Sequence, residues 1–436
     1  MAFAGKTYTV LSYGLFTLVF PLFRLYAQTT GKHTKELNQR FGSYPQKLIN
    51  QIKGSPRIWI HAASVGEVGA ALPVIHSILN KIPDAAIIIS TTTYHGQAFA
   101  QKKLGSIATC IYAPLDFIGS VRKALTTIQP HIMVFLETEI WPNWLFQAAH
   151  LGIKTAFING RISARSMTNY RKIRPLIRQS LKRVSAFSMI NRADADRIKE
   201  IGAPPQKVLI NGNAKFDVFS PEKNPGVKTK MFTLFNLHKN QPVFVAGSTR
   251  TGEEEIILNV YLNIIKQFPE TVLIIAPRHI QRARLIKKMV IQKHLSCTLR
   301  TELTSMEHTE NGSVIILDTI GELQDAYSIA NIVFCGGSLV PLGGQNILEP
   351  AAWGRPVIYG PSMEDFSEAK QLLEAAGAGI QVKNTRELTE NIITLLKDPQ
   401  KAKTTGNNAQ RAIISKTGAA ARHAAVIFQV LGMCKK

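Results

Sequence analysis

The chain has 436 residues, of which 45% are apolar, and these values predict two or three globular domains with sizeable cores. Its net charge of +23 predicts an anionic partner, which could be nucleic acid, a membrane surface or a phosphorylated substrate. The four cysteines are scattered without a Cys-x-x-Cys or Cys/His cluster, so the sequence indicates neither a disulfide framework nor a zinc site.

The N-terminus contains an uncharged, largely apolar run of 17 residues, from Thr7 to Phe23, which is at the short limit for crossing a bilayer. Basic residues follow this run and would keep the rest of the chain in the cytoplasm by the positive-inside rule. A cleaved signal peptide is an alternative, but no convincing small-x-small cleavage site follows the run. We therefore expect residues 1–30 to attach the chain to a membrane, either by spanning it or by lying in its interface.

Residues 57–217 alternate apolar runs with helical patterns, which is typical of a parallel sheet whose strands are buried on both faces. The predicted strands are Arg57–Ala63, Ala86–Thr93, Thr109–Ala113, His131–Glu139, Lys154–Asn159, Ala186–Asn191 and Lys207–Asn213. The polar, proline-containing stretch 220–226 then predicts a linker between domains.

The same alternation restarts after this linker. The predicted strands are Pro242–Ser248, Thr271–Pro277, Ser313–Leu317, Ile332–Gly336 and Pro356–Tyr359. The predicted helices are Glu253–Gln267, Arg282–His294, Asp365–Ala376, Glu387–Leu396 and Asn408–Leu431. The fold class is therefore α/β, with two doubly wound, Rossmann-like domains that we expect to face a central cleft. The expected boundaries are 31–219 for the first domain, 220–232 for the linker and 233–436 for the second, whose last helix could pack back on the first.

Residues 161–183 contain eight Lys or Arg residues and no acid, with apolar residues between them. A helix of this composition suits an anionic membrane surface or a phosphorylated lipid. A solvated basic face is the alternative without a ligand. Nucleic acid is a third possibility, but interleaved aromatic stacking platforms are absent from this segment.

The stretch from His61 to Ala70 places Ser64, Gly66 and Glu67 at a predicted strand-to-helix turn. Open α/β sheets hold their sites at the carboxyl ends of strands, so Glu67 is a candidate general base. Acids are also favoured in the first turn of a helix by its dipole, and a capping role for Glu67 therefore stays open.

Two Gly-Gly pairs, at 336–337 and 343–344, lie between a predicted strand end and a short helix. Glycines let a backbone approach a ligand closely, and free amides at a helix start bind phosphate. Glu349 lies one turn after Asn346 and could accept hydrogen bonds from ribose hydroxyls. The spacing of the glycines matches neither the dinucleotide fingerprint nor the P-loop. Glycine loops at strand ends are also common in all α/β folds, so this loop could exist without a ligand.

Other strand ends carry polar residues with two interpretations each. Arg278 could grip a phosphate with its planar fork or pair with a helix acid on the surface. Ser248 and Thr249 could contact a phosphate or simply cap the next helix. The turn at Glu322 could contact a base edge through its backbone, or Glu322 could be an ordinary first-turn acid.

In the first half, Glu137 and Glu139 end a strand, and two carboxylates at such a position seldom serve packing alone. Lys215 ends the last strand before the linker, where a cation could stabilise developing negative charge.

Together these residues resemble the family of 3-deoxy-D-manno-octulosonic acid (Kdo) transferases of lipopolysaccharide synthesis. The motifs that carry the resemblance cover essentially the whole chain and are Arg40–Gly42, Ala63–Glu67, Glu137–Asn143, Asn159–Arg161, Gly212–Asp217, Ala276–His279, Gly321–Leu323 and Gly344–Pro350. The resemblance implies a GT-B glycosyltransferase anchored at the cytoplasmic face of the inner membrane. It also implies transfer of Kdo from CMP-Kdo to lipid IVA, the lipid A precursor, with inversion at the anomeric carbon.

The same resemblance implies that Glu67 is the general base and that Glu137 and Lys215 stabilise the transition state. The implied CMP-binding positions are Pro277, Arg278, Ile320, Gly321, Glu322, Asn346, Ile347, Leu348 and Glu349. Six further residues are candidates for contacts with the substrates: Ser64, Gly66, Ser248, Thr249, Gly344 and Gln345. We expect no cofactor or metal, because CMP-Kdo is the donor substrate. The expected partners are CMP-Kdo, lipid IVA and anionic inner-membrane lipid, and not nucleic acid.

Two rival functions stay open on the sequence. The nearer is a membrane-associated GT-B enzyme that uses a UDP-sugar, or a sugar-nucleotide epimerase of the same fold. The other is a basic nucleic-acid-binding protein, against which the membrane segment and the strand-end carboxylates argue.

Overall fold

The computed structural model describes residues 5, 7–10, 13–14, 34–137, 139–219, 226–238, 240–303 and 309–433. The chain divides into two compact units, Met1–Val218 with Lys416–Lys436, and Phe219–Ser415. Most of the predicted membrane segment 1–30, and residues 220–225 of the predicted linker, lie outside the described residues. Of the helices that are described, none combines the length and the apolar character needed to cross a membrane.

The described part of the first unit contains one parallel sheet of seven strands in the order β3-β2-β1-β4-β5-β6-β7. The strands are β1 Arg57–His61, β2 Ala86–Thr91, β3 Thr109–Tyr112, β4 Ile132–Leu136, β5 Lys154–Gly160, β6 Ala186–Met189 and β7 Val208–Ile210. Each predicted strand of this half is confirmed. Most of these strands are almost fully buried, which explains why they appear in the sequence as continuous apolar runs.

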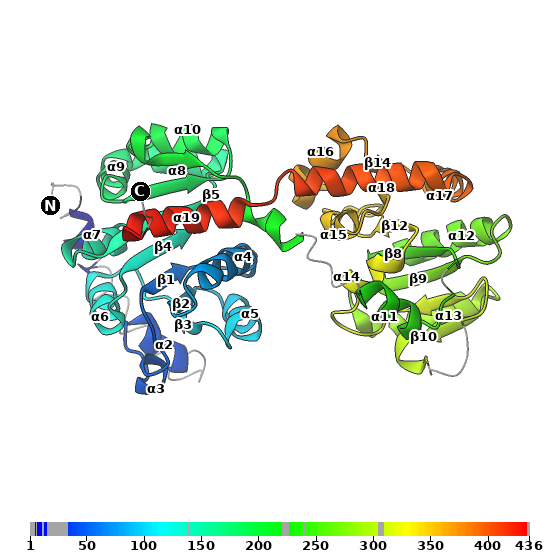
Figure 1. Cartoon of the computed structure of the whole chain (residues 1–436), viewed down its shortest axis with the longest axis horizontal. Helices are drawn as coiled ribbons and strands as arrows, with labels where there is room; N and C mark the ends of the chain where they lie inside the picture. The colour runs from blue at the N-terminus through cyan, green and yellow to red at the C-terminus, as the bar shows by residue number, and fades with distance from the viewer. Residues whose placement is uncertain are drawn as a thin grey trace. The chain divides into compact units, whose positions relative to one another are not determined.

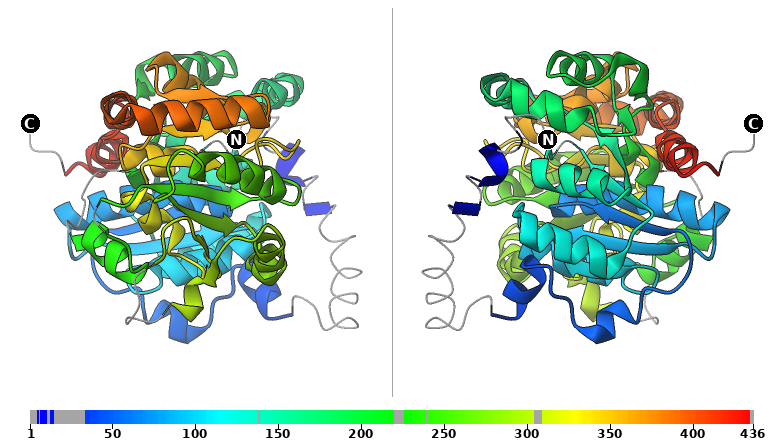
Figure 2. Two further views of the ribbon diagram at one scale, coloured as in Figure 1. Left: turned by 90° about the vertical axis from the view of Figure 1, so that its right-hand side faces the viewer. Right: turned by 90° about the vertical axis from the view of Figure 1, so that its left-hand side faces the viewer.

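Helices cover both faces of this sheet (Figures 1 and 2). Successive strand residues point to opposite faces, so Trp59 packs in one core and Ile58 and Ile60 in the other. The layer on the Trp59 side contains α6 Ile118–Ile128, α7 Pro142–His150, α8 Ala164–Lys172, α9 Arg174–Leu181 and α10 Arg192–Glu200. The opposite layer contains α4 Val65–Lys81, α5 Tyr94–Leu104 and α19 Ala419–Leu431. Two short helices, α2 Thr34–Arg40 and α3 Gln46–Ile49, precede the sheet.

The described part of the second unit repeats this architecture, with strand order β10-β11-β9-β8-β12-β13-β14, all parallel. The strands are β8 Val243–Thr249, β9 Val272–Pro277, β10 Cys297–Leu299, β11 Val314–Ile316, β12 Ile332–Cys335, β13 Val357–Tyr359 and β14 Gly379–Gln381. The five predicted strands are confirmed. The edge strands β10 and β14 were not predicted, because three partly buried residues carry too little apolar pattern.

Helices also lie on both sides of this second sheet (Figure 2). They are α11 Gly226–Leu234, α12 Glu253–Ile265, α13 Ala283–Gln292, α14 Leu323–Ala326, α15 Leu348–Ala352, α16 Ser367–Ala375, α17 Thr385–Lys397 and α18 Pro399–Ile414. Residues of α12, α13 and α17 share one core with the strands, and each fully buried Ile or Leu there contributes about 1.5–3 kcal/mol.

Two helix predictions were wrong in extent. The helix predicted over Asn408–Leu431 is two helices, α18 and α19, because Gly418 adopts φ +83° between them. The helix predicted within 161–183 is also two, α8 and α9, which meet at Ile173. Pro175 has no N–H to continue the first helix, and it occupies the first turn of the second.

In both sheets the strand order reverses beside one strand, at β1/β4 in the first unit and β8/β12 in the second. Ligands of open α/β sheets bind outside the carboxyl ends of the strands at such a switch point. The predicted site residues lie at these two sheet edges, and each edge is described below by itself.

Candidate active site

Glu67 occupies the third position of α4, directly after the end of β1. Its Oε2 accepts a hydrogen bond from the Ala63 N–H at 2.8 Å, and its Oε1 accepts one from the Ser64 hydroxyl at 3.0 Å. A glutamate side chain that accepts hydrogen bonds from the residues just before its helix stabilises the start of that helix. Glu67 therefore makes the kind of contact that the capping interpretation predicted. Only 8% of Glu67 is exposed, and each carboxylate oxygen keeps a lone pair for another donor.

Burial raises the pKa of Glu67 above its usual value, because it disfavours the charged form. The negative charges of Glu139 and Glu137 raise it further, while the bonds from Ala63 and Ser64 lower it. The carboxylate is therefore more basic than an ordinary surface glutamate. A base of this kind is suited to take a proton from a hydroxyl group.

Glu139 is held by two neighbours at the same sheet edge. Its Oε2 lies 3.1 Å from Nε2 of His61 and accepts a hydrogen bond from the Trp141 indole at 3.0 Å. Burial acts to raise the pKa of Glu139, but these contacts outweigh it and lower the pKa. Glu139 therefore stays ionised beside Glu67. The pair between Glu139 and His61 was not predicted, although His61 ends β1 and Glu139 follows β4, the strand beside it.

Glu137 and Lys215 form an ion pair at this edge, with 2.7 Å between Oε1 and Nζ. Glu137 follows β4 in the left-handed conformation, with φ +54°, and its N–H donates to the Ile158 carbonyl. Lys215 lies in the 3-10 helix η2, Ala214–Phe219, whose first N–H donates to Oδ1 of Asn159 at 2.8 Å. The structure thus brings together the three residues predicted to be catalytic: Glu67, Glu137 and Lys215.

His423 of α19 fixes the loops that carry these groups. Its Nε2 lies 3.0 Å from the Gly212 carbonyl and its Nδ1 lies 2.7 Å from the Ser188 hydroxyl. The carbonyl can only accept, so Nε2 carries the proton and Nδ1 accepts from Ser188. Burial lowers the pKa of His423 to about 4, so the imidazole is neutral at pH 7. No pattern in the sequence pointed to this residue.

In the second unit, the carboxylate of Glu253 binds the backbone amides of the residues that follow β12. Its carboxylate accepts hydrogen bonds from the N–H groups of Gly337 at 2.6 Å, Ser338 at 3.0 Å and Leu339 at 3.0 Å. These amides therefore serve the fold and are not available to a phosphate. Close packing also requires glycine at position 336, because a Cβ there would lie 2.6 Å from the Ser248 carbonyl oxygen.

Arg278, Asn346 and Glu349 form a second polar cluster, at the carboxyl edge of this sheet. The Asn346 amide donates to Oε1 of Glu349 at 3.2 Å, and its Oδ1 accepts the Leu348 N–H at 3.1 Å. Burial raises the pKa of Glu349, whereas Asn346 and the charge of Arg278 lower it. The Arg278 side chain is exposed and forms no ion pair with a described residue, so its guanidinium can meet an anion.

The other predicted contacts differ in what they offer. Ile347 and Leu348 are buried, and Pro277 is the buried end of β9. The Thr249 hydroxyl is buried and directed at Glu254, while Ser248 beside it has φ +55°.

The turn after β11 projects Ile320, which is 78% exposed, and Gly321 adopts φ +98°. Glu322 directly precedes α14, accepts a hydrogen bond from Thr319 and pairs with Arg300 at 3.3 Å. Gly344 (φ +82°) donates its N–H to the Gly337 carbonyl, and Gln345 is half-buried. Over the described residues, no three His, Cys, Asp or Glu side chains are grouped as metal ligands.

Solved structures place this architecture in a known class. A UDP-GlcNAc 2-epimerase from Neisseria meningitidis is 14% identical and matches 87% of this chain and 100% of its own, with a TM-score of 0.58. A glycosyltransferase from Rickettsia africae is 15% identical and matches 87% of this chain and 99% of its own, with a TM-score of 0.54. The fold is that of the GT-B class, which confirms the predicted α/β architecture.

Sequence relatives narrow the class to one family. A family model described as 3-deoxy-D-manno-octulosonic-acid transferase (kdotransferase) matches residues 35–218. A 3-deoxy-D-manno-octulosonic acid transferase from Haemophilus influenzae is 31% identical over 90% of this chain and 90% of its own length. A bifunctional glycosyltransferase/methyltransferase from Fusobacterium nucleatum is 34% identical over 82% of this chain, which spans 56% of that protein. The chain belongs to the Kdo transferase family and is a glycosyltransferase, as the resemblance in the sequence implied.

Proposed function

We propose that the protein transfers Kdo from CMP-Kdo to lipid IVA in lipopolysaccharide synthesis, with inversion at the anomeric carbon and with Glu67 as general base. The observation that carries the proposal is the Glu67 carboxylate: it lies at the carboxyl end of β1, is 8% exposed, and has a raised pKa. A family of Kdo transferases needs one group that accepts the proton of the acceptor hydroxyl, and Glu67 has the position and basicity for it.

The reaction is a single displacement. Glu67 takes the proton from the acceptor hydroxyl while that oxygen forms a bond to the anomeric carbon of Kdo. The bond from that carbon to the phosphate oxygen breaks on the opposite side, which inverts the configuration. CMP leaves as an anion and needs no proton, so one base is sufficient.

Lys215 stabilises the negative charge that develops in this step. One of the three ammonium N–H donors is directed at Glu137, and 40% of the side chain is exposed, so other donors remain for a substrate anion. Glu137 acts by fixing the ammonium in place. The positive charge at this edge is thus supplied by the ammonium group of Lys215.

The donor nucleotide binds to the second unit. The exposed guanidinium of Arg278 holds the phosphate through its planar fork. Glu349 accepts hydrogen bonds from the ribose hydroxyls, and Asn346 orients Glu349. The exposed turn at Ile320 and Gly321 lies against the base. No cofactor takes part.

The acceptor reaches the enzyme at the cytoplasmic face of the inner membrane, to which the N-terminal segment attaches the chain. Among the described N-terminal residues, Tyr8, the second residue of the apolar run, donates a hydrogen bond to Asp116 at 2.8 Å, so the start of the run contacts the rest of the first unit. The basic residues of α8 and α9, including the exposed Lys172 and Arg174, and the exposed Lys182 directly after α9 attract anionic lipid.

Product mass spectrometry with CMP-Kdo and lipid IVA tests the transfer. We expect a product that has gained Kdo, and isothermal titration should show tighter binding of CMP than of UDP. A protein that binds UDP in preference and leaves lipid IVA unmodified would support the UDP-sugar rival instead. Binding of duplex DNA or RNA at physiological salt would favour the nucleic-acid rival.

Vesicle flotation tests the membrane surface separately. Replacing Lys172 and Lys182 with Gln should weaken binding to vesicles that contain phosphatidylglycerol and leave CMP binding unchanged. The matched control replaces Lys102 and Lys103, two exposed lysines of α5, with Gln, and it should bind the vesicles as the unmodified protein does. Equal losses in the two pairs would contradict a role for α8 and α9.

A further inference from the structure

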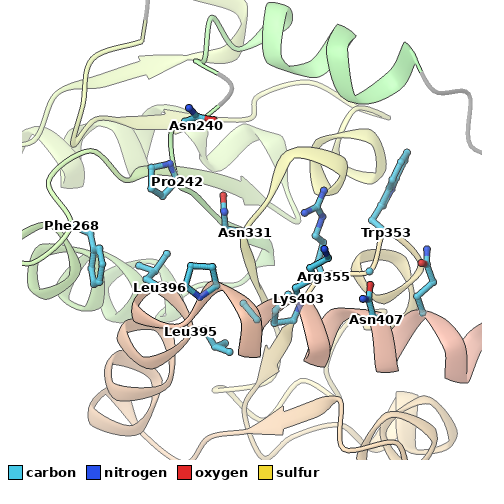
Figure 3. Close-up of a pocket in the computed structure, with 15 residues that line it drawn as sticks. Asn240, Pro242, Phe268, Asn331, Trp353, Arg355, Leu395, Leu396, Lys403 and Asn407 are labelled. Carbon is cyan, nitrogen blue, oxygen red and sulfur yellow. The ribbon is translucent and has the colours of Figure 1, made fainter.

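The second unit contains a pocket of about 520 Å³ at the amino ends of its strands. Pro242, Asn331 and Pro356, each the residue before a strand, contribute to its wall, and α17 and α18 complete it (Figure 3). Because the strands are parallel, this edge is the opposite one from the edge that carries Arg278 and Glu349. The volume lies in the range of small-molecule sites.

One side of the pocket carries positive charge without a matching acid. Arg355 and Lys403 line it, and no Asp or Glu is among the described residues that line the pocket. The Arg355 guanidinium donates to the Ser328 carbonyl, but its buried Nε has no hydrogen-bond partner among the described residues. Buried charges are normally paired, so this cation is placed to receive an anion.

The electrostatics around Arg355 agree with an uncompensated positive charge. Burial lowers the pKa of Arg355 to about 10. Burial also lowers the pKa of Lys228 on α11, and the positive charge of Arg355 lowers it further. An anion bound beside Arg355 would offset the positive charge that acts on Lys228.

The other side of the pocket is apolar. Phe268, Leu395 and Leu396 line it, and Figure 3 shows Phe268 and Leu396 across the pocket from Arg355 and Asn407. A ligand that fills this space therefore needs an anionic end and a flat or apolar body. The planar fork of arginine and the point charge of lysine together suit a phosphate group.

We propose that this pocket binds a small phosphate monoester with an apolar, aromatic body, with the phosphate on Arg355 and Lys403 and the ring against Phe268 and Leu396. The site is separate from the nucleotide site at the opposite sheet edge and does not depend on the transfer reaction. The exposed Asn240 and Asn407 can donate further hydrogen bonds to the phosphate or to a substituent of the ring.

Isothermal titration of the full chain with phenyl phosphate tests the proposal, with inorganic phosphate and phenol as partial ligands. Phenyl phosphate should bind more tightly than inorganic phosphate, and phenol should not bind measurably. Lys403→Gln should weaken phenyl phosphate binding roughly tenfold, because a charge-assisted hydrogen bond is lost. The matched control is Lys401→Gln, an exposed lysine of the same helix outside the pocket, which should leave the affinity unchanged.

Two further variants separate this site from its alternatives. Asn407→Phe narrows the pocket and keeps both cations, so it should abolish phenyl phosphate binding and preserve binding of inorganic phosphate. Arg278→Gln should leave phenyl phosphate binding intact. The proposal is overturned if phenyl phosphate does not bind, if Lys401→Gln and Lys403→Gln lose affinity equally, if Asn407→Phe binds normally, or if Arg278→Gln abolishes binding.

Discussion

The two units place a glutamate at the same point of the same topology and use it differently. In each, the central strand at the switch point leads through a turn into a helix, β1 into α4 and β8 into α12. Glu67 stands in the first turn of α4, and Glu253 stands at the first position of α12. Burial raises the pKa of both carboxyls.

The difference lies in how many donors each carboxylate meets. Glu253 accepts two backbone N–H groups on each oxygen, including that of Arg250, and is fully buried. Its acceptor capacity is filled, so it ties the end of β12 to the start of α12. Glu67 accepts two hydrogen bonds from described residues and remains 8% exposed. An acid at a strand end is available for chemistry only when its lone pairs are not already used.

The largest expected effect is on catalysis in the first unit. Glu67→Gln keeps the shape and an acceptor for Ala63 but removes the base, and the transfer rate should fall by about 10²–10⁴-fold. Initial rates of Kdo transfer measure this loss, and CMP affinity and the thermal unfolding midpoint serve as controls. A Glu67→Gln variant that folds, binds CMP and retains the full transfer rate would contradict the assignment of Glu67 as general base.

A smaller effect concerns His423, which stabilises the first unit only while it is neutral. Its pKa is about 4 in the folded state and 6.5 when unfolded, so the unfolded chain takes up a proton first as the pH falls. The contribution of His423 to stability should fall by about 1.4 kcal/mol per pH unit below 6.5, to a total of roughly 3 kcal/mol near pH 4.

Urea unfolding of the unmodified protein and of His423→Gln between pH 7 and 5 isolates this contribution. Burial raises the pKa of Asp116 to about 6, which makes the folded state take up the proton first, but this effect is common to both proteins. The unmodified protein should lose stability more steeply on acidification. Identical slopes would show that His423 does not anchor α19 through its neutral form.

The counterpart in the second unit is Glu253→Gln, which should affect stability and not chemistry. The new amide group would face N–H donors and leave at least one of them unsatisfied, at a cost of about 1–3 kcal/mol. Chemical denaturation measures the loss. If the variant were as stable as the unmodified protein but could not transfer Kdo, the contrast between the two glutamates would be reversed.

The smallest effect is expected at the Glu137–Lys215 pair. Because both side chains are partly exposed, a double-mutant cycle with Glu137→Gln and Lys215→Met should give a coupling energy for unfolding below about 1 kcal/mol. Each single variant should nevertheless lower the transfer rate. A coupling energy of several kcal/mol with unchanged rates would make the pair a structural feature.

The strands were predictable from the sequence wherever they are buried on both faces. Ile132–Leu136 and Val272–Pro277 are continuously apolar and fully buried. The three-residue edge strands β10 and β14 are only partly buried, and their pairing comes from neighbours far away in the sequence. The breaks before α9 and α19 depend on Pro175 and Gly418, whose local effects a longer helical pattern had concealed.

The site was predictable only in part. Glu67, Glu137 and Lys215 follow strand ends, and a parallel sheet gathers such positions at one edge. Glu253 binds the amides after β12 from 84 residues earlier in the chain, and no sequence pattern links such distant positions. His423 contacts Ser188 across 235 residues, and helical periodicity identifies a buried face without naming its polar partner.

The pH dependence of kcat/KM for Kdo transfer tests the role of Glu67 most directly. A general base must be deprotonated, so the rate should fall as the pH drops through the pKa of Glu67, which burial places above the ordinary value of 4.5. The acidic limb should therefore have its midpoint above 4.5 and should be absent from the residual activity of Glu67→Gln. An acidic limb that is unchanged in Glu67→Gln would contradict the assignment and direct attention to Glu139 or to another group as the base.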